Sequence, residues 1–198
     1  MCLHVLNGYN TFIYNNKKKS VGVSFNYTFN DKLSLGYYNL YGNEVADSVK
    51  GPHLRGLNNL VLTFQLSKAI KAIVGADYIF QQHSQLKDPG KSAIAYSLIA
   101  TLRCQLTKKM AAYVRGETFS DTNGMLTGVI TDSKMNATGY KLNDATLGFE
   151  VKPLESAFIR LEGRSIFMDS NQKIFHDANS HSNSNIRMEA FMNLGVWF

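Results

Sequence analysis

Residues 20–42, SVGVSFNYTFNDKLSLGYYNLYG, place an apolar side chain at almost every second position on either side of one short polar turn. Alternation with a period of two is typical of β-strands whose two faces meet different surroundings. The apolar face of this predicted hairpin carries Val21, Val23, Phe25, Tyr27 and Phe29, then Leu33, Leu35, Tyr37 and Tyr41. The hairpin therefore has one dry and one wet face, which fits both a soluble sandwich and a membrane barrel.

Composition narrows the choice of function. The 198 residues show no break in composition, so we expect one domain over residues 1–198. A net charge of +6 could suit nucleic acid, but the basic residues are scattered, and the only run, NKKK at 16–19, is typical of a solvated loop. Cys2 and Cys104 lack the spacing of metal ligands. We therefore predict no nucleic-acid partner, no metal site and no cofactor.

No segment has the pattern of a transmembrane helix or of a secretory signal. No apolar run approaches the roughly 20 residues that a transmembrane helix needs. The opening MCLHVLNGYN lacks the charged start, apolar core and small-residue cleavage site of a secretory signal. An outer-membrane location therefore requires that the signal has been removed, or that these residues are the later part of a longer chain.

The same alternation recurs along the whole chain. We expect strands at about residues 3–13, 20–29, 33–42, 57–67, 70–81, 94–105, 110–121, 144–152, 156–168 and 186–198. Most are close to the roughly 9 to 11 residues with which a tilted strand crosses a bilayer, and longer than the usual globular strand.

The connections between these strands alternate in length. Short turns fall at 30–32, 67–69, 106–109 and 152–155, and long polar loops at 43–55, 82–92, 122–139 and 170–185. All short turns then lie on one rim and all long loops on the other. This arrangement is typical of outer-membrane barrels, with a periplasmic and an extracellular rim, and rare in Greek-key sandwiches.

Charged residues keep to one face of the predicted strands. Arg115 and Glu117, for example, point away from Ala112 and Val114. We predict that these charged residues line the lumen of a barrel: Lys71, Asp77, Arg103, Arg115, Glu117, Glu150, Arg160, Glu162, Arg164, Arg187 and Glu189. The expected fold is an all-β, antiparallel, up-and-down transmembrane β-barrel with about ten strands in this chain, either closed on those strands or an incomplete part of a larger barrel.

Particular segments resemble a known family. The last residues, FMNLGVWF, end in Phe198 and resemble the C-terminal assembly signal of bacterial outer-membrane barrels. LNGYNT at 6–11, the segment 19–44, YVRGETFSD at 113–121 and ATLGFEVKPLESAFIRLEGR at 145–164 resemble the outer-membrane β-barrel porins called OmpL-like. The resemblance implies a place in the bacterial outer membrane, contact with its lipid and with the barrel assembly machinery through the C-terminal strand, and a position late in a longer polypeptide.

Two functions fit this pattern. The first is a passive channel for small hydrophilic solutes or ions, unless the lumen charges pair into a plug. The alternative is a non-conducting structural or adhesive barrel whose long loops bind partners. We do not expect an enzyme, because His53, His83, His176 and His181 lie in loops near Asp47, Asp88 and Asp177 without a nucleophile elbow or HExxH pattern. The sequence leaves the solute and the oligomeric state open.

Overall fold

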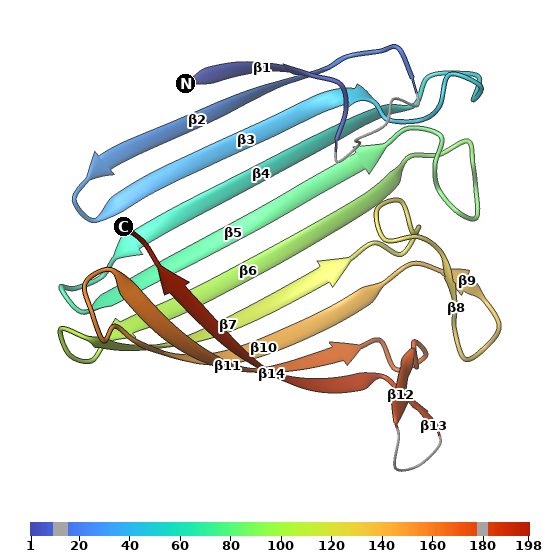
Figure 1. Cartoon of the computed structure of the whole chain (residues 1–198). Coiled ribbons are helices and arrows are strands. Elements are labelled where there is room, and N and C mark those ends of the chain that lie inside the picture. Colours follow the sequence, from blue (N-terminus) through green and yellow to red (C-terminus); the bar gives the residue numbers. More distant parts are fainter. Residues whose placement is uncertain (10–15, 178–181) are drawn as a thin grey trace.

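The computed structural model describes residues 1–9, 16–177 and 182–198. Within this part of the chain, ten strands form a single antiparallel sheet (Figure 1). They are β1 (Cys2–Leu6), β2 (Ser20–Asn30), β3 (Leu33–Asn43), β4 (Leu54–Gln65), β5 (Ile70–Gln81), β6 (Ala93–Gln105), β7 (Met110–Ser120), β10 (Lys141–Val151), β11 (Ala157–Met168) and β14 (Ile186–Val196). No helix in the described ranges is long and apolar enough to cross a membrane.

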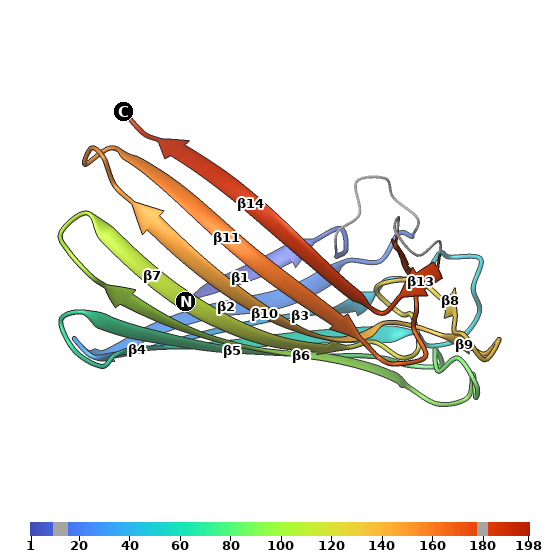
Figure 2. The same cartoon turned by 90° about the horizontal axis from the view of Figure 1, so that it is seen from below.

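Strand order in the sheet follows strand order in the chain. Each strand pairs with its neighbour in an antiparallel register, so the sheet is a meander, as the short turns predicted. The same sheet bends into a trough, seen from its side in Figure 2. It is open in the described part of the chain, with β1 and β14 as its two edges, so these residues do not adopt the closed ten-strand alternative.

The predicted rims are confirmed. In Figure 1 the short turns gather at one end of the strands and the long loops at the other. Two loops contain small hairpins that the sequence did not predict: β8 (Ile130–Thr131) with β9 (Ala137–Thr138), and β12 (Phe175–Asp177) with β13 (Ser182–Ser184).

The first predicted strand, 3–13, was too long. β1 ends at Leu6, and the following Gly8 has a φ of 145°, a backbone conformation that other residues rarely adopt. Residues 10–13 of that prediction lie outside the described residues. The other predicted strands agree within a few residues, and 70–81 coincides with β5.

The register carries the two faces of the strands across the whole sheet. Leu98, for example, lies between Ala76 of β5 and Thr118 of β7. Large apolar side chains on this outer face stay exposed, as with Leu98 at 52% and Leu147 at 65%. Among the described strand residues, no Lys, Arg, Asp or Glu lies on this face, apart from Lys141 at the loop end of β10.

The inner face is the concave one. Small side chains on it are covered, including Ala93 and Ala95 at 0% exposed and Ala111 at 1%. Charged or polar side chains on the same face are also buried, including Gln81, Asp144 and Glu150, whereas the large apolar side chains of the outer face are exposed, so the polarity of the sheet is inverted relative to a soluble protein. This is the arrangement expected of a barrel wall in lipid.

Aromatic residues gather near both ends of the outer face. On β2, the rings of Phe25 and Tyr27 stack at 6.1 Å, and Tyr27 meets Phe29 edge-on at 4.8 Å, near the short-turn rim. Near the loop rim, the ring of Phe80 lies 6.3 Å from that of Tyr41. Such belts mark the two membrane interfaces of barrels.

Candidate functional site: the charged inner face

The predicted charged residues all lie on the inner face of the sheet. The register places Arg115 opposite Thr146, and Thr146 opposite Arg164. Most of these charges belong to β6, β7, β10, β11 and β14, which form one half of the trough. There the structure brings them into two clusters and a separate pair.

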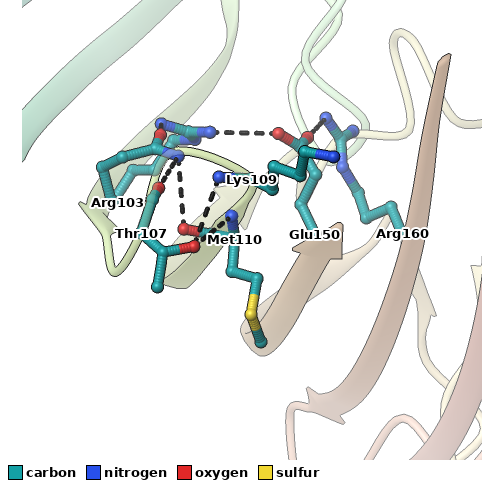
Figure 3. Close-up of polar contacts among 7 residues, drawn as sticks. Arg103, Thr107, Lys109, Met110, Glu150 and Arg160 are labelled. Carbon is teal, nitrogen blue, oxygen red and sulfur yellow. Dashed lines mark hydrogen bonds and ion pairs between the residues drawn. The ribbon is translucent and has the colours of Figure 1, made fainter. Parts of the chain in front are cut away.

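The first cluster is centred on Glu150. Its carboxylate accepts a hydrogen bond from Arg103 at 3.0 Å through Oε1 and from Arg160 at 2.7 Å through Oε2 (Figure 3). The side chain of Glu150 is only 8% exposed. Arg103 reaches it across β7 because the residue opposite Glu150 on β7 is the small Ala111. One carboxylate thus connects β6, β10 and β11.

Tyr113 extends the first cluster toward the middle of the sheet. Its hydroxyl donates a hydrogen bond to Glu162, and the guanidinium of Arg160 lies 5.8 Å from its ring centroid. The residue of β10 between Tyr113 and Glu162 is Gly148, where a Cβ atom would overlap the Tyr113 ring. A glycine is therefore required for Tyr113 to cross β10 and reach Glu162.

The second cluster is centred on Asp144, which the sequence analysis did not select. Its side chain is fully buried, receives a hydrogen bond from Arg164 and accepts another from the Thr146 hydroxyl at 3.1 Å. Thr146 in turn accepts a hydrogen bond from Arg115 at 3.3 Å, and Arg115 forms an ion pair with Glu117 at 2.5 Å. Continuing the alternation of β10 backwards from Glu150 would have placed Asp144 on this face.

The remaining predicted residues stand apart. Arg187 and Glu189 form their own ion pair at 2.7 Å on β14. Asp77 accepts hydrogen bonds from Asn59 at 2.7 Å and from Ser97 at 2.5 Å. Lys71 faces Arg103 across the ladder and takes part in none of the ion pairs found among the described residues.

Arginine and lysine are divided between the strands and the connections. The arginines of the sequence all belong to the inner face: Arg55, Arg103, Arg115, Arg160, Arg164 and Arg187. Arg55, also missed from the sequence, donates to Gln81 at 2.7 Å. Most lysines lie in turns and loops. The planar guanidinium suits ordered, partly covered ion pairs, whereas the strongly hydrated ammonium suits a wet rim.

The chemistry of this face is electrostatic. Alternating guanidinium and carboxylate groups present fixed charges of both signs to whatever occupies the trough. Among the described residues there is no group of His, Cys, Asp and Glu that could hold a metal ion. The loop histidines His53 and His83 pack ring to ring at 5.9 Å, and His181 lies outside the described residues.

Comparison with known proteins agrees with this architecture. A family model described as "Putative beta-barrel porin-2, OmpL-like" (BBP2) matches residues 1–194. Among solved structures, the chain is similar in fold to one titled "NanC porin structure in rhombohedral crystal form", with a TM-score of 0.56 and 8% sequence identity over 91% of this chain and 79% of that chain. No curated protein matches the chain. The resemblance found in the sequence is confirmed by the family match.

Proposed function

Since the chain belongs to the OmpL-like β-barrel porin family, we propose that it forms an outer-membrane channel for the passive diffusion of small hydrophilic solutes or ions. The observation that carries this proposal is the separation of charge between the two faces. Charged groups are costly against lipid, and the strands confine them to the inner face. An inner face of this kind suits a wall in contact with water.

The two clusters supply the selecting field. Each brings guanidinium and carboxylate groups together at a different height of the wall, the Glu150 cluster near the short turns and the Asp144 cluster nearer the loops. Fixed charges inside a pore select solutes by sign and by size. In a narrow barrel the same charges would instead pair across the lumen and close it.

Conduction also depends on how the edges of the sheet are closed. The edge strands β1 and β14 would expose unpaired backbone groups, which hydrocarbon does not tolerate. We expect further strands, from the same polypeptide or from a second copy, to complete the wall. The exposed Phe198 after β14 would act as the signal for the barrel assembly machinery.

A specific observation also favours the alternative of a non-conducting barrel that binds partners through its loops. The long loops are linked to one another: Leu86 N–H donates to Asn123 at 3.0 Å, and Gln172 donates to the carbonyl of Gly139 at 2.7 Å. A polar cavity of about 610 Å³ lies between the 82–92 and 122–139 loops. Ordered loops of this kind could recognise a partner.

Planar-bilayer recordings separate the two functions. The test variant changes Arg115, Arg160 and Arg164 together to Gln. If the chain forms a channel, the wild type should conduct. The reversal potential of the variant should then indicate greater selectivity for cations, because the carboxylates dominate the inner face once the arginines are neutral.

A matched control changes the loop lysines Lys87, Lys91 and Lys134 to Gln, with a smaller expected shift. Absence of conductance in properly folded wild type would favour the partner-binding barrel. An open channel whose selectivity ignores the arginines would refute their role as pore-lining residues.

A further inference from the structure

Two short turns of the same rim share a sequence and a construction. Residues 64–70 read FQLSKAI and residues 104–110 read CQLTKKM, so both contain Gln, Leu, Ser or Thr, and Lys in order. In the first, Ser67 Oγ accepts hydrogen bonds from the N–H of Ala69 at 3.3 Å and of Ile70 at 3.1 Å. Gln65 donates to the carbonyl of Ser67 at 2.7 Å.

The second turn repeats these contacts one strand pair further along. Thr107 Oγ1 accepts hydrogen bonds from the N–H of Lys109 at 3.2 Å and of Met110 at 3.1 Å (Figure 3). Gln105 donates to the carbonyl of Thr107 at 2.8 Å. In both turns the glutamine and the hydroxyl satisfy the backbone from within. The leucine side chains and the lysine ammonium groups take no part in these turn contacts, although Lys109 Nζ donates a hydrogen bond to the carbonyl of Pro153 in the neighbouring short turn at 3.3 Å.

The leucine and lysine side chains of the two turns combine apolar and cationic groups. Leu66 is 60% exposed and Leu106 is 53% exposed. Beside them Lys68, Lys108 and Lys109 are exposed.

The other short turns continue the pattern. One carries the exposed Lys32, and another carries Lys152 with Leu154, which is 65% exposed. The acidic residues of these turns are Asp31 and Glu155, so lysine is in excess along this rim.

The position of the turns places these leucine and lysine side chains at the membrane interface. They end strands whose outer face is apolar, so they lie where the bilayer meets water. There a leucine can enter the acyl boundary while a lysine stem extends its ammonium to the headgroup level. An ammonium group on a flexible stem suits a phosphate as a point charge.

We propose that the short-turn rim binds the headgroups of anionic phospholipids, with Lys68, Lys108 and Lys109 contacting phosphate and Leu66 and Leu106 anchored among the acyl chains. This inference goes beyond channel function and does not depend on conduction.

The test measures lipid preference directly. The purified chain is reconstituted in phosphatidylcholine bilayers, and the association of spin-labelled phosphatidylglycerol is compared with that of spin-labelled phosphatidylcholine by electron paramagnetic resonance. The wild type is expected to prefer phosphatidylglycerol several-fold, and 0.5 M salt is expected to weaken this preference. Changing Lys68, Lys108 and Lys109 together to Gln should remove most of it.

The control is the Lys87, Lys91 and Lys134 triple change to Gln on the opposite rim, which should retain the preference. Far-UV circular dichroism establishes that each variant is folded, and the single variants Lys68→Gln and Lys108→Gln replace a triple that does not refold, each with a partial loss expected. A wild-type preference near one would overturn the proposal. So would equal losses in both triples, because net charge alone would then explain the effect.

Discussion

Replacing Leu98 by Arg tests the assignment of the outer face to lipid. Leu98 lies near the middle of the 13-residue strand β6 and is 52% exposed. In a soluble protein, a polar change at such an exposed position usually alters stability by about 0.5 kcal/mol or less. On the lipid face of a barrel, Arg at the midplane costs about 2–4 kcal/mol. We therefore expect the free energy of unfolding to fall by about 2–4 kcal/mol.

Urea unfolding of the chain refolded in lipid vesicles measures this loss, with fluorescence from the single tryptophan, Trp197, as the signal. The matched control is Ser97→Arg, one residue away on the inner face. This change removes the 2.5 Å hydrogen bond from Ser97 to Asp77, but it places a guanidinium beside that carboxylate. The free energy of unfolding should therefore change by no more than about 1 kcal/mol. Equal losses in the two variants would refute the face assignment.

Three further outcomes are expected. Glu150→Gln should lower the free energy of unfolding by about 2–3 kcal/mol in the same urea titration, because two guanidinium groups lose a charged acceptor. Glu189→Gln should lower it by less than about 1 kcal/mol, because its partner Arg187 is 55% exposed. Asp121→Ala removes the acceptor for the N–H groups of residues 125–127, so limited proteolysis should cut the 122–139 loop faster, while unchanged protection would contradict this anchoring role. The backbone hydrogen bond from Asn136 lowers the pKa of Asp132 below its ordinary 3.8. The ionised carboxylate should therefore stabilise this turn fully above pH 3.8, and the stabilisation should be lost only as the pH falls through the lower pKa of the folded state. An NMR pH titration of the Asn136 amide shift should show a midpoint below 3.8.

The faces of the strands could be predicted because a period of two fixes them by parity alone. Pairing then places residues of the same face side by side, so an assignment made on one strand carries to the next. The charged residues chosen from the sequence accordingly share one face in the structure. Asp144, the first residue of the predicted strand 144–152, was not selected, although the alternation from Glu150 places it on the same face.

The contacts between those charges could not be predicted. Arg103 and Glu150 are 47 positions apart, and their ion pair depends on the register of two successive ladders, β6 with β7 and β7 with β10. It also depends on a small residue, Ala111, at the crossing point. The alternation of apolar and polar residues specifies neither the register between neighbouring strands nor whether a side chain has room to cross a strand.

Nearest-neighbour pairing has a consequence for how the chain folds. Every ladder of the main sheet joins strands that follow one another, so each can form by closing a single connection, and the contact order stays low for a β-protein. The sheet can therefore grow one hairpin at a time. The ion pair from Arg103 to Glu150 spans β7 without belonging to any hairpin, so it forms only after β6, β7 and β10 are in register. An interaction that forms this late stabilises the native sheet by slowing unfolding, and it does not accelerate the earlier folding steps.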